Sequence, residues 1–337
     1  MKSNHPKKRR KERARGPKSP RPDGPVFAAI DLGTNNCRLL IARPASGGGF
    51  RVIDSFSRIV RLGEGLAETG RLGPAGIERT VAALAICAGR LAANRVTHLR
   101  AIATEACRRA ANAGELVARV RAETGLALDI VTSEEEARLA ALGCEPLIGR
   151  RYEGALVFDI GGGSTELIWM RKGAGRAQSP PSVSLDAGVV TLAETLGADR
   201  PLEDYLEAIA PMFSGAKKRL ETAAQIDVGA VHLLGTSGTV TTLAGIALGL
   251  PHYIRARVDG SWHECADILA IVARLFAMDR EARAGLACVG AERADLVLPG
   301  CAIFAAIHAQ WPCAELRVAD RGLRDGMLRE QMAEAGI

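Results

Sequence analysis

The stretch ALVFDIGGGSTELIWM at residues 155–170 decides how the rest of the chain is interpreted. Apolar residues without helical periodicity flank a short polar centre, which predicts two buried strands joined by a tight turn. The three glycines at 161–163 carry no Cβ, so the backbone N–H groups of the turn can converge on an anion. Asp159 ends the first strand, and its carboxylate would repel a bare phosphate. We therefore expect Asp159 to hold a cation or a water beside the anion.

A second stretch, FAAIDLGTNNCRLLIA at residues 27–42, repeats the order of apolar strand, Asp, Gly, hydroxyl residue and apolar strand. Its Asp31 lies 128 residues before Asp159. Either hairpin alone is compatible with an ordinary turn, since Gly and Asn are common turn residues. Two copies in one chain favour a duplicated unit with an anion-binding turn in each half.

The composition is typical of a globular protein with two domains. The 337 residues allow about two domains of ~150 residues, and the 47% hydrophobic content can build a sizeable core. No apolar segment approaches the ~20 residues that a membrane helix needs, so no membrane partner is expected. The eight cysteines are scattered and form no Cys-x-x-Cys pair. This usage predicts reduced thiols in a cytoplasmic protein, without structural zinc.

The basic character of the chain is local. The first 24 residues contain ten Lys and Arg against two acids, a net charge of +8, while the whole chain carries +6. The rest of the chain is therefore at −2. Because the segment has no Ile, Leu, Val or aromatic residue, residues 1–25 are expected to be a disordered basic tail. It is either a solvated extension without a dedicated role or an arm that attracts a polyanionic substrate or, weakly, nucleic acid.

Strands alternate with helices along the remaining chain, which predicts an α/β fold. Gly143 and Pro146 break a helix just before the second hairpin, which favours an N-terminal domain at residues 26–140 and a C-terminal domain at 141–337. The strands expected outside the hairpins are 50–62, 97–104, 126–131, 183–185, 230–234 and 315–318. Helices are expected at 74–91, 105–124, from 133, at 201–222, up to 250, at 262–277, 293–310 and 323–333.

Three glutamates, Glu134, Glu135 and Glu136, open the helix that starts near residue 133. Ser133 is a good N-cap residue, and Glu136 three residues later completes a capping box. Acids in the first turn also suit the helix dipole. The residues alone therefore favour a structural role for all three glutamates.

The turn GTSG at residues 235–238 follows an apolar strand and opens a helix. A helix N-terminus of this kind binds anions or nucleotides, and a plain strand-to-helix loop is an equal alternative. The chain contains no P-loop, no Gly-x-Gly-x-x-Gly after a strand and no Gly-x-Ser-x-Gly elbow, and its six histidines are isolated. If the chain catalyses a reaction, carboxylates and hydroxyls must carry it.

The two Asp-containing hairpins resemble the phosphate motifs of the actin–hexokinase–sugar-kinase superfamily. Within it, the chain is similar to the exopolyphosphatase/guanosine pentaphosphate phosphatase (Ppx/GppA) family, in a short form without the C-terminal helical domain of longer members. Further matching motifs follow in order: VRLGEGL at 60–66, ATEACR at 103–108, EEARL at 135–139, GTSGT at 235–239 and DRGLRDG at 320–326. The resemblance implies two RNase H-like α/β domains with a cleft between them.

The resemblance also implies roles for single residues. Glu136 would orient or deprotonate the attacking water, which replaces the structural interpretation of that residue, and Arg108 would contact the substrate phosphate. Asp31 and Asp159 would hold a metal ion or its waters, with support from Glu166. The residues expected to bind phosphate are Gly33, Thr34, Asn35, Gly161, Gly162, Gly163, Ser164, Thr165, Gly235 and Ser237.

The activity implied is hydrolysis of the terminal phosphate of inorganic polyphosphate with Mg²⁺, or Mn²⁺ in its place, and with a monovalent cation as a further cofactor. Polyphosphate is favoured because a long anion suits a groove lined by two phosphate turns. The short form also offers less protein surface for contact with a nucleotide base. Guanosine pentaphosphate hydrolysis is the alternative, followed by a non-catalytic alarmone-binding regulator and a superfamily kinase. A homodimer is expected from the same resemblance.

Overall fold

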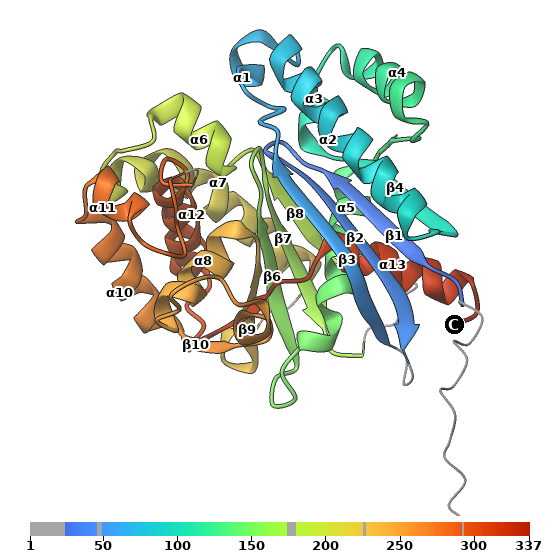
Figure 1. Cartoon of the computed structure of the whole chain (residues 1–337). Helices are drawn as coiled ribbons and strands as arrows, with labels where there is room; N and C mark the ends of the chain where they lie inside the picture. The colour runs from blue at the N-terminus through green and yellow to red at the C-terminus, as the bar shows by residue number, and fades with distance from the viewer. Residues whose placement is uncertain (1–23, 46–48, 174–179, 225–226, 292) are drawn as a thin grey trace, which may run out of the picture.

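The computed structural model describes residues 24–45, 49–173, 180–224, 227–291 and 293–337. The expected basic tail lies outside these residues up to position 23. Two sheets form the centre of the molecule (Figure 1), and the first has the strand order β3-β2-β1-β4-β5. Its strands are β1 Phe27–Leu32, β2 Asn36–Ala45, β3 Gly49–Ile59, β4 His98–Ala103 and β5 Asp129–Ile130.

The second sheet has the order β10-β11-β9-β6-β7-β8. Its strands are β6 Gly154–Ile160, β7 Thr165–Arg171, β8 Ser182–Leu185, β9 Val231–Thr236, β10 Trp262–Glu264 and β11 Glu315–Ala319. In each sheet an antiparallel hairpin leads to a third strand, and parallel strands join the other side of the first strand. β1 therefore corresponds to β6, and β2 to β7. The repeated topology confirms the duplicated unit and an RNase H-like fold in each half.

Helices cover the outer faces of both sheets (Figure 1). The helices in the first half of the sequence are α1 Leu66–Thr69, α2 Pro74–Ala93, α3 Glu105–Arg109, α4 Ala113–Thr124 and α5 Ser133–Cys144. The 3-10 turn η1 covers Glu145–Leu147 and η2 covers Val228–Ala230. The helices of the second half are α6 Val189–Leu196, α7 Leu202–Ala223, α8 Gly238–Ala247, α9 Arg255–Val258, α10 Cys265–Phe276, α11 Arg280–Ala284, α12 Val297–Gln310 and α13 Leu323–Glu334.

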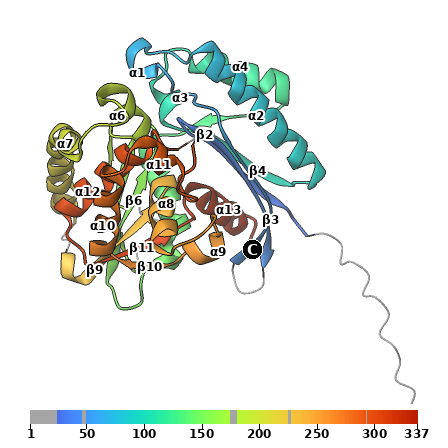
Figure 2. The same ribbon diagram turned by 60° about the vertical axis from the view of Figure 1, so that its left-hand side comes forward.

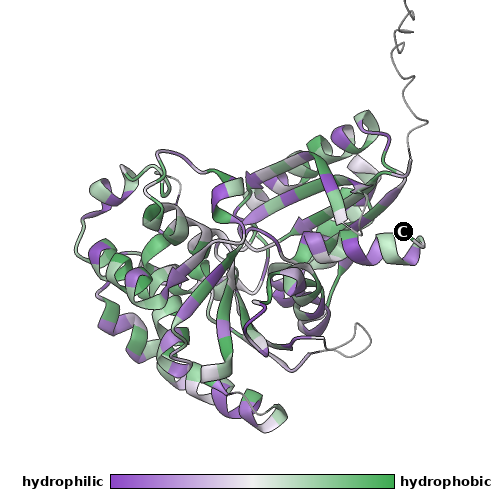
Figure 3. Cartoon of the chain, turned by 90° about the horizontal axis from the view of Figure 1, so that it is seen from below, coloured by the Kyte–Doolittle hydropathy of each residue, from purple (hydrophilic) through white to green (hydrophobic). Residues whose placement is uncertain are grey.

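Each half has its own hydrophobic core. One core joins the first sheet to α2 and α4, and a larger one joins the second sheet to α7, α8, α10 and α12. Several exposed helices alternate between hydrophobic and hydrophilic segments (Figure 3), as expected for helices with one buried face. Among the described residues, no helix combines the length and apolar character needed to cross a bilayer.

The last helix of each half packs on the sheet of the other half. α5 packs on the second sheet, and α13 packs on β1 and β2 of the first. Figure 2 shows α13 beside the first sheet. The two helices also contact each other at backbone distance, because a Cβ at Gly326 would lie 1.9 Å from the carbonyl oxygen of Leu139. A Cβ at Gly143 would likewise lie 2.1 Å from the carbonyl oxygen of Gly322. The expected domain limits stay a prediction, since each sheet draws one covering helix from the other side of residue 141.

A ring of alternating charges reinforces the contact between α5 and α13. Arg100 on β4 pairs with Glu135 on α5 at 2.6 Å and also with Glu330 on α13. Arg138 on α5 pairs with the same two glutamates, with Nε 2.8 Å from Glu135 Oε2. The four side chains are only 19–27% exposed, so the ring fixes the first turn of α5 against β4 and α13.

Several local expectations differ from the structure. Residues 262–264 form strand β10, because they pair with β11, and do not start a helix. The helix expected at 105–124 is divided into α3 and α4, and the helix expected from 293 begins at Val297. β5 contains Asp129–Ile130 rather than residues 126–131, because its partner β4 already ends at Ala103. The helix α6 was not expected, because the eight residues Val189–Leu196 are too short for a clear helical period.

Candidate active site

The two glycine turns contain the same hydrogen bond. The N–H of Gly33 donates to the carbonyl of Asn36 at 2.9 Å, and the N–H of Gly161 donates to the carbonyl of Ser164 at 2.9 Å. Each turn joins the first antiparallel pair of its sheet. The turns predicted from the sequence therefore occupy equivalent places in the two halves.

The two turns touch each other. Thr34 is buried, and a Cβ at Gly162 would lie 3.0 Å from its Cβ and 3.4 Å from the backbone nitrogen of Asn35. A Cβ at Gly163 would lie 2.9 Å from Oγ1 of Thr34. Glycine is thus required here by the contact between the halves, in addition to the access of an anion that the sequence suggested.

The unexpected helix α6 supports the second turn. Its first residues, Val189 and Val190, donate N–H groups to the carbonyls of Gly161 and Gly162 at 3.0 and 2.8 Å. The hydroxyl of Thr191 donates to the carbonyl of Gly163 at 3.2 Å. With its carbonyls fixed toward α6, the turn can present N–H groups on its other side.

Asp31 and Asp159 stand at the matching ends of β1 and β6. Burial raises the pKa of both carboxyls, that of Asp159 to about 6. The charge of Asp31 raises the pKa of Asp159 further, while Arg38 and Arg324 lower both values. The structure therefore brings together the two acids that the sequence predicted, with Arg38 and Arg324 near both of them.

Glu166 lies beside Asp159, because directly paired residues of antiparallel strands project to the same side. It is 3% exposed, and the hydroxyls of Ser164 and Ser184 donate to its Oε1 at 2.6 and 3.0 Å. Burial, with the charge of Asp159, raises the pKa of Glu166 to about 7. The hydroxyl of Thr165 donates to the carbonyl of Ala187, so it is used within the fold.

Glu136 faces the same region from the first turn of α5. Burial and the charge of Glu166 raise the pKa of Glu136 well above its usual range, and Arg108 opposes this shift. Nη1 of Arg108 lies 2.6 Å from Oε2 of Glu136. The predicted N-cap at Ser133 is wrong: the side chain of Thr132 accepts the N–H of Glu135 at 3.2 Å, because the helix begins one residue earlier.

Three charged side chains near this centre were missed by the sequence analysis. Glu105 pairs with Arg108 at 2.7 Å, a contact that the spacing of three residues on one helix could have indicated. Arg38 faces Asp31 across the first hairpin, where the strand register gives the signal. Arg324 acts on Asp31 and Asp159 from the first turn of α13, which only the long-range packing reveals.

The GTSG turn lies at the same edge of the second sheet, since Asp159 pairs with Thr236 across the parallel strands β6 and β9. Ser237 has φ 119° and ψ 169°, a conformation that is essentially restricted to glycine. Its side chain caps α8 by accepting the N–H of Val240 at 3.4 Å. A Cβ at Gly235 would lie 2.5 Å from Cζ of Phe158, so this residue serves close packing of the strand end.

The donor set suits a magnesium ion bound largely through water. Among the described residues, no three His, Cys, Asp or Glu side chains are grouped closely enough to hold a metal directly. Mg²⁺ commonly uses one or two carboxylates together with waters and substrate phosphates. Asp31 and Asp159 fit that mode, because both are half-buried at the ends of β1 and β6 and the charge of Asp31 raises the pKa of Asp159.

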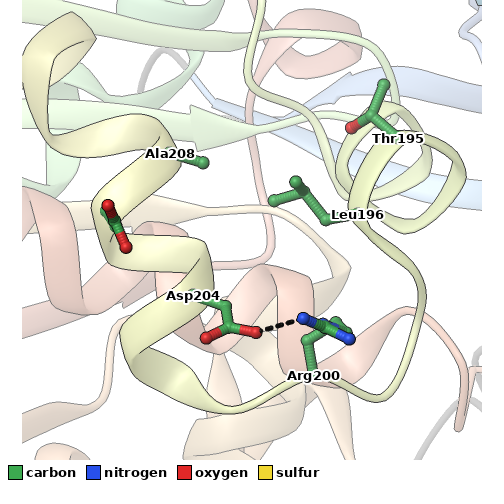
Figure 4. Close-up of a pocket in the computed structure, with 6 residues that line it drawn as sticks. Thr195, Leu196, Arg200, Asp204 and Ala208 are labelled. Atoms are coloured by element: carbon green, nitrogen blue, oxygen red, sulfur yellow. Dashed lines mark ion pairs between the residues drawn. The ribbon is translucent and has the colours of Figure 1, made fainter.

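One hollow in the described part of the chain lies away from these residues. It has a volume of about 680 Å³ between α6 and α7 and includes the Arg200–Asp204 ion pair (Figure 4). None of the buried carboxylates lines it. A much smaller cavity of about 10 Å³ reaches Thr34, Glu105 and Gly163, where the two halves are in contact. The chemistry of the side chains, rather than the size of the cavity, identifies the candidate site.

Comparisons with known proteins point to one family. The profile of the Ppx/GppA phosphatase family matches residues 40–335. Exopolyphosphatase 2 of Mycobacterium tuberculosis (strain CDC 1551 / Oshkosh) is 34% identical over 282 residues, which cover 80% of this chain and 86% of that protein.

Solved structures with the same fold include a Ppx/GppA family member from Aquifex aeolicus. It has a TM-score of 0.76 and 29% identity, and the match covers 93% of this chain and 99% of that chain. A protein described as exopolyphosphatase-like has a TM-score of 0.81 and 28% identity, with the same coverage of 93% and 99%.

Proposed function

Because the chain belongs to the Ppx/GppA phosphatase family and is a hydrolase of phosphoanhydride bonds, we propose that its substrate is inorganic polyphosphate. The protein releases orthophosphate from the end of the polyphosphate chain. Support comes from the 34% identical relative, which is an exopolyphosphatase. A long anion also suits two glycine turns that face each other across the contact of the two halves.

The observation that carries the mechanism is the position of Glu136 among buried charges. A carboxylate held out of bulk water beside Arg108 and Glu166 is suited to orient a water and to accept its proton. The water oxygen forms a bond to the terminal phosphorus while the bond to the bridging oxygen breaks. The proton passes to Oε of Glu136, and the leaving polyphosphate is shorter by one phosphate.

The other residues bind and orient. Arg108 and the N–H groups of Gly162 and Gly163 take up charge on the phosphate oxygens. Asp31 and Asp159 would hold Mg²⁺, supported by Glu166, and the ion would supply charge neutralisation at the phosphates. Ser237 presents the N-terminus of α8 from the third turn.

The test of this function is a substrate panel. Phosphate release is measured with Mg²⁺ from polyphosphate, guanosine pentaphosphate and ATP at equal concentrations of terminal phosphate. We expect the highest kcat/KM with polyphosphate. A preference for guanosine pentaphosphate would replace this proposal with the nucleotide phosphohydrolase. Phosphate transfer to an acceptor instead of to water would identify a kinase, and binding without turnover would identify a regulator.

A further inference from the structure

Glu105 is a buried acid that the mechanism above does not use. It is the first residue of α3, two residues after the end of β4 at Ala103, and it is only 8% exposed. Its two carboxylate oxygens face different arginines. Oε2 lies 2.7 Å from Nη2 of Arg108, and Oε1 lies 3.8 Å from Nε of Arg109.

Arg108 is shared between two acids. Its Nη2 pairs with Glu105, while its Nη1 pairs with Glu136 at 2.6 Å and donates to the carbonyl of Val131 at 3.1 Å. The side chains of all three residues are 11–16% exposed. Because the two acids use different nitrogens, Arg108 makes only a one-sided contact with Glu136.

Glu105 also touches the second glycine turn. A Cβ at Gly163 would lie 3.0 Å from Cγ of Glu105 and 2.9 Å from Oγ1 of Thr34. The stem of Glu105 is therefore packed at the point where the turns of the two halves meet. The surrounding structure therefore fixes its carboxylate, unlike that of a flexible side chain in solvent.

We propose that Glu105 is a positioning residue, which holds Arg108 by Nη2 and so prevents a two-pronged pair between Arg108 and Glu136. This inference rests on the proposed function, in which Glu136 orients the attacking water. A guanidinium binds a carboxylate most strongly through two parallel N–H bonds. When Glu105 occupies one nitrogen, one oxygen of Glu136 remains available to water.

The substitution Glu105→Gln removes the charge and keeps a similar shape. The neutral amide holds Arg108 less firmly, so the guanidinium turns toward Glu136 and pairs with both of its carboxylate oxygens. Glu136 can then no longer accept a proton from water. We expect kcat to fall roughly 10- to 100-fold, the range seen when the partner of an active group is removed. KM for polyphosphate should not rise, because the variant also removes a negative charge from the neighbourhood of the substrate.

A double-mutant cycle that combines Glu105→Gln with Arg108→Ala tests whether Glu105 acts through Arg108. In that background, Glu105→Gln should change kcat by less than about 2-fold, since coupled residues are strongly non-additive. The matched control is Glu115→Gln, which removes an acid paired with Arg71 at the surface and should leave kcat and KM unchanged. If Glu105→Gln fails to fold by thermal denaturation, Glu105→Asp is measured in both backgrounds.

An equal loss of kcat in both backgrounds would overturn the inference, and so would an unchanged kcat in the single variant. A rise in KM without a loss of kcat would also overturn it, because it would place Glu105 in substrate binding. Failure of the proposed function is distinguishable, since the wild-type protein would then release no phosphate from polyphosphate before any variant is compared.

Discussion

The stability of the protein should depend on the protonation of His232, a residue remote from the proposed chemistry. His232 is 0% exposed on β9. The N–H of Gly149 donates to its Nε2 at 3.1 Å, so Nδ1 carries the proton and donates to the carbonyl of Leu233 at 2.8 Å. The rings of Tyr152 and Trp262 pack beside it. This environment accepts the neutral imidazole and has no place for a second ring proton.

Burial lowers the pKa of His232 from 6.5 to about 4. Between these values the unfolded chain binds a proton that the folded chain excludes, so stability falls as the pH falls below 6.5. For one such group the loss between pH 7 and pH 5 is about 2 kcal/mol. Asp159 and Glu166 have raised pKa values, so their protonation increases stability as the pH falls. The contribution of His232 must therefore be isolated by a variant.

The assay is urea unfolding at pH 7 and pH 5 for the wild-type protein and His232→Gln. The amide can accept the N–H of Gly149 without titrating. We expect the variant to lose about 2 kcal/mol less stability than the wild type between the two pH values. His252→Gln, at an exposed position, is the control and should follow the wild type. The same pH dependence in all three proteins would refute the reasoning.

Three further predictions concern stability and the contact between the halves. Ser237→Gly should raise the free energy of unfolding by about 1 kcal/mol, because glycine accepts the strained backbone at φ 119°; a lower value in urea unfolding would contradict this. Gly162→Ala should lower kcat/KM for phosphate release roughly 100-fold, because the new Cβ would lie 3.0 Å from Cβ of Thr34 and separate the turns; a wild-type rate would exclude a tight contact during catalysis. Glu330→Gln should lower the free energy of unfolding by about 1–2 kcal/mol by weakening the ring with Arg100 and Arg138, whereas Glu334→Gln at the exposed end of α13 should not.

Much of the fold is visible in local sequence patterns. The two hairpins follow from apolar runs around Asp and Gly, and their equivalence predicted the duplicated unit that the strand orders confirm. The exchange of α5 and α13 could not be predicted, because it depends on packing between segments almost 200 residues apart. The cap at Thr132 was missed, since Ser133 beside it is an equally good capping residue.

The site was predicted in part. Asp31 and Asp159 stand out because they adjoin the glycine turns, Glu166 was indicated only by the family resemblance, and the structure places the three together. The ion pair of Arg108 with Glu136 joins α3 to α5 across 28 residues, so spacing alone could not supply it, whereas the spacing of three residues could have indicated the pair of Arg108 with Glu105. The roles of these residues, the metal ions, the homodimer and the cytoplasmic location stay predictions.

The central claim is that Glu136 positions the attacking water, and one kinetic comparison tests it most directly. Phosphate release from polyphosphate with Mg²⁺ is measured for the wild type, for Glu136→Gln and for Glu134→Gln, an exposed acid of the same helical turn. We expect kcat to fall by roughly 10²- to 10⁴-fold in Glu136→Gln, the usual worth of a positioned base, and to stay at the wild-type level in Glu134→Gln. Equal kcat in all three folded proteins would remove Glu136 from the mechanism.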